Sequence, residues 1–317
     1  MTRPVLLQTV ALLPSLERQL AETYTVHRLP APGAERDSFL QQRAAEFDGL
    51  VTSAATGANA ALIAALPKLR VISSFGVGLD VIDLDAARQR GIPVGYTPDV
   101  LNDCVADQAF ALLLAIARRI PEADRFVRAG KWEAKQNFPF GRQVTGARLG
   151  IVGLGRIGRT IAKRASGFDM EVRYHSRKPV AGVTFEHEPK LLEMARWCDF
   201  LVVITAGGAE TRHLVNAEVL DALGTKGYIV NVARGTVIDE AALVKALQEK
   251  RIGGAGLDVY DSEPHVPHEL FTLDNVVLAP HIASATVQTR EAMGQRVLDN
   301  LAAFYAGKPM PSDATAD

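Results

Sequence analysis

Leu149-Gly-Ile-Val-Gly-Leu-Gly-Arg-Ile-Gly158 is a short apolar run that passes into spaced glycines, and it indicates the class of fold. Gly153, Gly155 and Gly158 follow a candidate strand and open a helical pattern over Ile157–Ala165. In a dinucleotide-binding unit such glycines make a tight turn, admit the backbone to the pyrophosphate and let helix and strand pack closely. The free N–H groups at the helix N-terminus then face the anion. A glycine-rich turn without a ligand is the alternative.

Short apolar runs alternate with helical patterns on both sides of this stretch. Several runs are continuous, as expected for parallel strands that are covered on both faces. Helical patterns between them include Ala58–Ala65 and Glu240–Glu249. This rhythm predicts a doubly wound α/β fold with a parallel sheet. The expected strands are Val5–Leu7, Gly49–Val51, Val71–Ser73, Leu149–Val152, Glu171–Tyr174, Phe200–Ile204, Tyr228–Asn231, Gly254–Leu257 and Val276–Leu278.

The rhythm occurs twice, which predicts two doubly wound parallel-sheet domains. Residues 1–98 contain no glycine motif, so we expect them to form a flavodoxin-like substrate domain, completed by a C-terminal helix within residues 285–317. Residues 99–284 are expected to form a Rossmann dinucleotide-binding domain, with a long helical stretch, Val105–Ala129, near its start. The ending, Pro309–Asp317, has the character of a frayed terminus.

Composition limits the possible partners. Of the 317 residues, 48% are hydrophobic and 22% are charged, with a formal net charge of −1. This is a globular balance, and it favours neither a nucleic-acid partner nor a membrane. Cys104 and Cys198 lie in no metal or redox spacing, so we expect no metal site and a reducing cytosol. Polar residues and Pro14 interrupt the first twenty residues, which predicts a strand and a helix rather than a signal peptide.

The residues after the second strand of the glycine-motif domain select the cofactor. NAD-binding chains place an acid there, which binds the ribose 2′-hydroxyl and repels a 2′-phosphate. This chain has Ser176, Arg177 and Lys178 instead. A hydroxyl group and two cations suit a phosphate dianion, which Arg can bind in bidentate fashion. We therefore expect NADP(H), with NAD(H) used at lower efficiency; a solvated basic turn is the alternative.

Three polar residues follow later strand-like runs: Arg234, Glu263 and His281. Residues just past the carboxyl ends of parallel strands line the ligand crevice, so we expect the three to converge. An Arg holds a carboxylate and a developing oxyanion, a His donates a proton near neutral pH, and a carboxylate orients the imidazole. The set suits reduction of a 2-keto acid. Taken singly, they also fit a surface ion pair, an exposed loop acid and a satisfied loop histidine.

Together these motifs resemble the D-2-hydroxyacid dehydrogenase family, most closely its glyoxylate, hydroxypyruvate and hydroxyphenylpyruvate reductases. The resemblance covers nearly the whole chain, and it implies an active site of Arg234, Glu263 and His281. It also implies D stereochemistry and a homodimer joined through the cofactor domain. The matching stretches are Ser73–Asp80, Thr97–Leu101, Val105–Asp107, Gly153–Gly158, Asn231–Gly235, Leu257–Pro264 and Pro280–Ser284.

The resemblance also implies binding roles in both domains. Backbone N–H groups near Val77 and Gly78 would hold the substrate carboxylate, and Ser53 and Ala54 would lie on the pocket wall. Asp258 would bind the nicotinamide amide. The expected cofactor-binding residues are Gly153, Leu154, Gly155, Arg156, Ile157, Gly158, Ser176, Arg177, Lys178, Thr205, Val232, Ala233, Asp258, His281 and Ala283.

The sequence departs from the family pattern after the fourth strand of the cofactor domain. Thr205-Ala206-Gly207-Gly208-Ala209 replaces the usual Pro and Thr, which predicts a looser loop over the cofactor. Glyoxylate or hydroxypyruvate is the expected substrate. Trp132, Phe138 and Phe140 leave an aryl pyruvate as the runner-up, although packing explains these aromatic residues better. A dinucleotide-sensing binding protein without catalysis is a further alternative, because corepressors that resemble this family keep the three catalytic residues.

Overall fold

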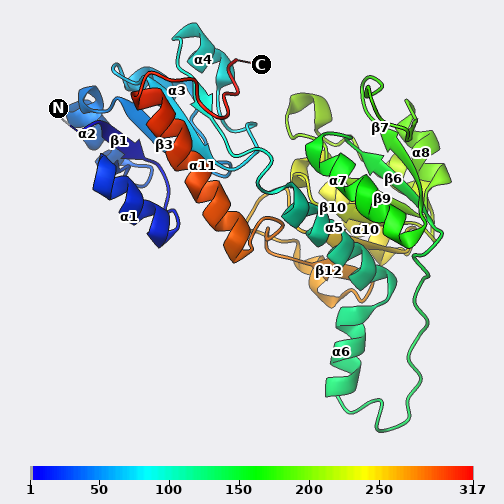
Figure 1. Ribbon diagram of the computed structural model, residues 1–317. Coiled ribbons are helices and arrows are strands. Elements are labelled where there is room, and N and C mark those ends of the chain that lie inside the picture. Colours follow the sequence, from blue (N-terminus) through cyan, green and yellow to red (C-terminus); the bar gives the residue numbers. More distant parts are fainter. Residues whose placement is uncertain (1–2, 317) are drawn as a thin grey trace. The chain divides into compact units, whose positions relative to one another are not determined.

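The computed structural model describes residues 3–316, and the chain divides into two compact units (Figure 1). The first unit combines the residues up to Leu101 with those from Ala285 onward, and the second is Asn102–Ser284. The sequence places the first boundary at residue 98, and the units change after Leu101. No helix between residues 3 and 316 has both the length and the apolar character that crossing a membrane requires.

The first unit is built on a five-stranded parallel sheet of order β2-β1-β3-β4-β5, the flavodoxin-like arrangement. Helix α11 packs against β4 and β5. The strands are β1 (Val5–Gln8), β2 (Thr25–Arg28), β3 (Gly49–Ser53), β4 (Val71–Phe75) and β5 (Val94–Gly95). The helices are α1 (Pro14–Thr23), α2 (Ala34–Arg43), α3 (Ala60–Ala65), α4 (Leu84–Gln89) and α11 (Val287–Tyr305).

The second unit is built on a seven-stranded parallel sheet of order β12-β11-β10-β9-β6-β7-β8. The order reverses at β6, whose neighbours are β7 and β9, and such a switch point is where open α/β sheets bind ligands. The strands are β6 (Arg148–Val152), β7 (Glu171–His175), β8 (Glu186–His187), β9 (Phe200–Val203), β10 (Tyr228–Asn231), β11 (Gly254–Leu257) and β12 (Val276–Leu278). The helices are α5 (Asn102–Ala117), α6 (Ile120–Arg128), α7 (Arg156–Ala165), α8 (Leu191–Trp197), α9 (Ala217–Leu223) and α10 (Glu240–Gln248).

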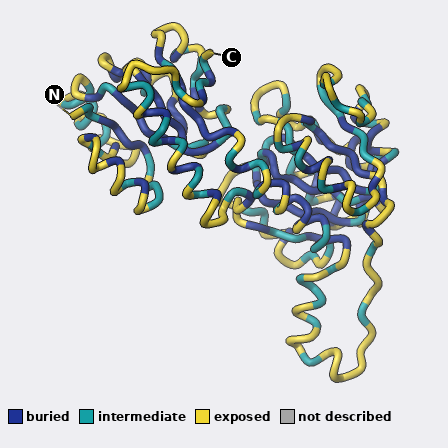
Figure 2. The backbone as a smooth tube through the Cα atoms, viewed as in Figure 1, coloured by how far each residue is buried: buried dark blue, intermediate teal, exposed yellow. Residues whose placement is uncertain are grey.

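The central strands of both sheets are buried, as continuous apolar runs predict (Figure 2). All nine expected strands are present, with ends that differ by at most two residues. The sequence did not reveal β2, β5 and β8. These are edge strands of two to four residues, and β2 and β8 are only partly buried, so they carry no apolar run.

The expected helical stretch over Val105–Ala129 is present, but the chain divides it into two helices, α5 and α6. Arg119 adopts a left-handed conformation with φ of 56°, and Pro121 lies in the first turn of α6, where its missing N–H group costs nothing. Helix α6 and the segment after it project from the rest of the second unit and are largely exposed (Figures 1 and 2). Helix α6 and the segment after it are called the arm below, and several apolar side chains of the arm are exposed.

The expected frayed terminus is also wrong for residues 309–316, and Asp317 lies outside the described residues. Ser312 and Ala314 are buried. The Ser312 hydroxyl group donates to the Tyr96 carbonyl at 2.5 Å, and the Ala314 N–H group donates to the Val94 carbonyl at 2.8 Å. The buried Asn300 amide oxygen accepts a hydrogen bond from the Ser312 N–H group at 3.2 Å. Hydrogen bonds therefore hold the C-terminal segment against β5 and against Tyr96, the residue after it.

Candidate active site

The phosphate-binding loop connects β6 to α7. Gly153 has a φ of 100°, and a Cβ atom there would lie 2.8 Å from the Cα atom of Thr205. A Cβ atom on Gly158 would lie 2.2 Å from the Gly153 carbonyl oxygen, so close packing of α7 requires glycine. A Cβ atom on Gly155 would instead meet nothing within 4 Å. The loop therefore leaves room beside the N-terminus of α7 for a pyrophosphate.

The turn after β7 presents the basic residues. The Ser176 hydroxyl group donates to the Lys178 carbonyl at 2.7 Å, which braces the turn. Arg177 Nη1 lies 2.5 Å from Glu210 Oε2. The side chains of Arg177 and Lys178 are exposed, and no acid stands in this turn. The residues fit a 2′-phosphate, but Glu210, which no sequence motif marks, already contacts one of the two cations.

The turn after β10 is shaped by a buried amide. The Asn231 side chain donates to the Arg234 carbonyl at 3.0 Å and accepts from the Ala233 N–H group at 3.1 Å. Arg234 Nη1 donates to the Ala233 carbonyl at 2.8 Å, and Val232 and Ala233 are buried. A Cβ atom on Gly235 would lie 1.8 Å from the Tyr260 carbonyl carbon. The turns after β10 and β11 are thus in close contact.

Asp258, at the end of β11, fixes the loop that carries His281. Its two carboxylate oxygens accept from the N–H groups of Ile282 and Ala283 at 2.9 and 2.8 Å. Its carbonyl oxygen accepts from the His281 N–H group at 2.9 Å. Asp258 is completely buried, and that burial raises the pKa of its carboxyl group. Its expected contact with a nicotinamide amide stays a prediction.

The hydrogen bonds to Asp258 hold His281 in an uncommon backbone conformation. Its φ is 53°, in the left-handed region that non-glycine residues rarely adopt. Such strain persists only where surrounding contacts determine it, and it is frequent at functional sites. The His281 imidazole ring is therefore held at the carboxyl ends of the strands, and 44% of the His281 side chain is exposed.

Glu263 and His281 form a hydrogen-bonded pair, with Nδ1–H of His281 donating to Glu263 Oε2 at 2.7 Å. Glu263 Oε1 accepts from the Tyr260 N–H group at 3.1 Å. Burial acts to raise the pKa of Glu263, but the hydrogen bond and charge of His281, the Tyr260 N–H group and the Arg234 charge together hold that pKa below its ordinary value. With Nδ1 engaged, Nε2 is the ring nitrogen left to face a substrate.

Two supporting residues escaped the sequence analysis. Glu240, in the first turn of α10, accepts a hydrogen bond from the Asp261 N–H group at 3.1 Å, and burial raises the pKa of its carboxyl group. The Tyr260 hydroxyl group donates to the Ala279 carbonyl at 3.0 Å. These contacts brace the loops of Glu263 and His281. No local pattern marks either residue, because each role depends on a tertiary contact.

The remaining expected site residues belong to the first unit. Ser53 ends β3, and its hydroxyl oxygen accepts two N–H groups of the following turn at 3.3 Å. Gly76 has a φ of 147°, and a Cβ atom there would lie 2.4 Å from the Cβ atom of Ala54. Val77 and Gly78 are partly exposed, and their N–H groups have no acceptor among residues 3–316. Unpaired backbone donors at the end of a strand suit an anion such as a carboxylate.

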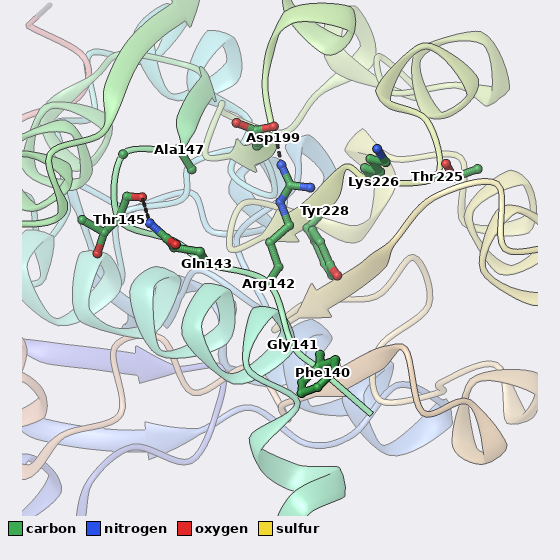
Figure 3. A pocket seen from close by; sticks show the side chains of 11 residues that line it. Phe140, Gly141, Arg142, Gln143, Thr145, Ala147, Asp199, Thr225, Lys226 and Tyr228 are labelled. Carbon is green, nitrogen blue, oxygen red and sulfur yellow. Dashed lines mark hydrogen bonds and ion pairs between the residues drawn. The ribbon is translucent and has the colours of Figure 1, made fainter. Parts of the chain in front are cut away.

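A hollow of about 610 Å³ lies at the amino ends of the strands of the seven-stranded sheet (Figure 3). Ala147 and Asp199 precede strands there, and Tyr228 begins one. Arg142 donates to Asp199 at 2.6 Å along its wall. Ligand crevices of parallel sheets lie at the carboxyl ends of the strands, so this hollow is not the reaction site. Within the described part of the chain, no group of three or more His, Cys, Asp or Glu side chains is placed to hold a metal ion.

Comparison with known proteins decides the family. Residues 110–283 match the family described as D-isomer specific 2-hydroxyacid dehydrogenase, NAD binding domain, over more than half of the chain. The chain belongs to this family. As a D-isomer specific 2-hydroxyacid dehydrogenase, it is an oxidoreductase with a nicotinamide dinucleotide domain, and the expected two-domain parallel-sheet fold is confirmed.

Several reductases within this family are similar to the chain. Glyoxylate/hydroxypyruvate reductase A of Arabidopsis thaliana is 45% identical over 295 residues, which cover 93% of this chain and 94% of that protein. Hydroxyphenylpyruvate reductase of Plectranthus scutellarioides is 46% identical over 295 residues, with the same coverage of 93% and 94%. The structure of the NADPH-dependent glyoxylate/hydroxypyruvate reductase from Sinorhizobium meliloti, in complex with NADP and malonate, matches with a TM-score of 0.92 and 41% identity, covering 99% of this chain and 97% of that one.

Proposed function

We propose that this dehydrogenase uses NADPH to reduce glyoxylate or hydroxypyruvate to the 2-hydroxy acid, with the D configuration where C2 becomes a stereocentre, as it does with hydroxypyruvate. The observation that carries the proposal is the Glu263–His281 hydrogen bond at the carboxyl edge of the seven-stranded sheet, with the Arg234 charge acting on the same carboxylate. An oriented imidazole beside a guanidinium suits keto-acid reduction. The names of two similar proteins, both glyoxylate/hydroxypyruvate reductases, support this substrate class.

The residues divide the chemistry between them. Arg234 binds the substrate carboxylate and stabilises negative charge that develops on the C2 oxygen. When bound, NADPH supplies a hydride to C2 and becomes NADP⁺. His281 gives the Nε2 proton to the carbonyl oxygen, which completes the hydroxyl group, and the neutral ring then recovers a proton from solvent. Glu263 orients the ring through Nδ1 and favours its protonated form before the transfer.

The remaining expected residues receive binding roles in this proposal. The loop from Gly153 to Gly158 holds the pyrophosphate, and Ser176, Arg177 and Lys178 hold the 2′-phosphate. The N–H groups of Val77 and Gly78 bind the substrate carboxylate, with Ser53 and Ala54 as neighbours of the substrate. Residues assigned to the nicotinamide half of the cofactor are Thr205, Val232, Ala233, Asp258, His281 and Ala283.

We also propose a homodimer that forms through the cofactor domain. The arm of the second unit exposes 56% of Ile120, 54% of Val127, 71% of Trp132 and all of Phe140. Large exposed apolar side chains that gather on one segment are typical of an interaction surface. Sedimentation should give twice the chain mass of 34.1 kDa, and a monomer at micromolar concentration would contradict the proposal. We further propose the reducing cytosol as the location, because neither Cys104 nor Cys198 forms a disulfide in the described part of the chain.

An aryl pyruvate is the second candidate substrate, because the 46% identical relative is a hydroxyphenylpyruvate reductase. The deciding experiment follows the loss of NADPH absorbance with glyoxylate, hydroxypyruvate and 4-hydroxyphenylpyruvate separately, and repeats each assay with NADH. The ranking of kcat/KM names the substrate class and the cofactor. Chiral analysis of the products from hydroxypyruvate and 4-hydroxyphenylpyruvate tests the D configuration, because the product from glyoxylate is achiral. Tight NADPH binding without turnover on any of them would favour a dinucleotide-sensing protein instead.

A further inference from the structure

An ion pair crosses the switch point of the second sheet. Arg177 follows β7, whereas Glu210 lies in the short helix η3 (Ala209–Thr211) after β9. Strands β7 and β9 are the two neighbours of β6, whose carboxyl end carries the phosphate-binding loop (Figure 1). Arg177 Nη1 and Glu210 Oε2 are 2.5 Å apart, so the pair joins the loops on either side of that phosphate-binding loop.

Both ends of this ion pair are braced. On one side, the Thr211 hydroxyl group donates to the carbonyls of Ala206 and Gly208 at 2.8 and 3.3 Å, which folds the Glu210 loop onto itself. On the other side, His187 Nε2 lies 2.9 Å from the Ser176 carbonyl oxygen. The loop departs from the family pattern, but it is held by its own hydrogen bonds.

We propose that Glu210 determines cofactor specificity by competing with the ribose 2′-phosphate for the Arg177 guanidinium. The inference rests on the proposed function, which assigns Arg177 to that phosphate. Glu210 contacts Nη1 of Arg177 alone. A phosphate that binds the guanidinium must therefore either displace the carboxylate from Nη1 or lie beside it and meet like-charge repulsion, and both oppose binding of the dianion. NADH carries no 2′-phosphate and meets neither effect. Glu210 therefore narrows the preference for NADPH over NADH.

The size of the effect follows from the exposure of the pair. The side chains of Arg177 and Glu210 are 86% and 77% exposed, and such pairs are weak and sensitive to salt. Removal of the Glu210 charge should therefore tighten NADPH binding about two- to fivefold at low ionic strength. The gain should shrink as salt is added, and the dissociation constant for NADH should not change.

Calorimetric titration with NADPH and NADH, without substrate, tests the inference independently of turnover. The variant Glu210→Gln keeps the shape of the side chain and removes its charge. Glu218→Gln is the matched control, because Glu218 is an exposed acid on α9 that makes no ion pair among residues 3–316. We expect tighter NADPH binding for Glu210→Gln alone. Unchanged NADPH affinity, or equal tightening for NADH, would overturn the inference.

Two further variants separate the inference from the proposal on which it rests. Arg177→Gln should weaken NADPH binding, and Glu210→Gln should have no additional effect in that background, since the two residues act as a unit. If Arg177→Gln leaves NADPH affinity unchanged, the assignment of the 2′-phosphate fails and the inference fails with it. If Arg177→Gln weakens binding but Glu210→Gln tightens it equally in both backgrounds, Glu210 acts without Arg177 and only the inference is wrong.

Discussion

Nδ1 of His281 lies 2.7 Å from Oε2 of Glu263, although the two residues are 18 positions apart in the chain. His281 lies in the loop after β12 and Glu263 in the loop after β11, so both are at the carboxyl ends of strands of one sheet. Asp258 secures the first loop, and the Tyr260 N–H group secures the carboxylate of the second. The pair is therefore held by backbone contacts on both sides, and it is the basis of the first three predictions.

Replacement of His281 by Ala should lower kcat by roughly 10²–10⁴, the usual contribution of a general acid. His281→Asn should behave alike, and it is the better matched variant because Asn tolerates the left-handed backbone found at this position. Steady-state kinetics give the effect, and thermal unfolding checks that both variants are folded. Turnover near that of the unaltered enzyme would remove His281 from the mechanism.

The variant Glu263→Gln should change the pH dependence of reduction. The pKa of Glu263 is below its ordinary value, so its carboxylate stays charged until the pH falls through that lowered value. A neutral amide does not titrate, so the part of the decline of kcat/KM in acid that comes from protonation of Glu263 should be absent in the variant. An identical pH profile would show that Glu263 does not act through its charge.

The same lowered pKa has a consequence for stability. A carboxyl group whose pKa falls on folding stabilises the fold above its unfolded-state pKa, and that contribution is lost as the pH falls through the folded-state value. The difference in the free energy of unfolding between the unaltered protein and Glu263→Gln should therefore be present at neutral pH and disappear in acid. A difference that grows in acid would contradict the direction of the shift.

Arg234→Lys should be severely impaired although it keeps the charge, because an ammonium group cannot replace the planar guanidinium fork. We expect kcat/KM to fall by at least about 10², as for other groups that stabilise a developing oxyanion. Arg196→Lys, on the exposed face of α8, is the matched control. If both variants keep normal kcat and KM, Arg234 does not contact the substrate.

Ser176→Asp should weaken NADPH binding by about tenfold or more, because a carboxylate at this turn repels a 2′-phosphate. NADH binding should be retained. Ser38→Asp, on the exposed surface of α2, adds the same charge in the first unit and should have no effect. Titration of each variant with both dinucleotides gives the ratio of dissociation constants. Equal NADPH affinity for both variants would mean that the phosphate binds elsewhere.

Ser312→Ala should destabilise the first unit without changing catalysis. The hydroxyl group of Ser312 donates to the Tyr96 carbonyl, and both groups are buried, so its removal should lower the free energy of unfolding by about 1–2 kcal/mol. Urea denaturation measures the change, and Ser38→Ala provides an exposed control. A frayed tail would make the two variants equally stable.

The sequence predicted the parts of this protein whose signal is local. An apolar strand that runs into Gly153, Gly155 and Gly158 indicates a phosphate-binding loop by itself. The tight turn, the space for the pyrophosphate and the close packing of the helix each require a glycine, and the three glycines are close together in the sequence. Arg234, Glu263 and His281 were identifiable because parallel strands bring their carboxyl ends to one edge. The short edge strands and the fastened tail were missed, since their stability comes from contacts with distant residues.

The sequence alone was therefore enough for the family resemblance, the alternation of the long buried strands with helices, and the identity of the residues that follow those strands. How those residues are held depends on tertiary contacts. Glu240 braces the Glu263 loop, Asp258 fixes the backbone at His281, and Glu210 occupies Arg177. Each of these contacts joins loops from different strands. Their geometry depends on how the sheet twists and packs, and no spacing along the chain records it.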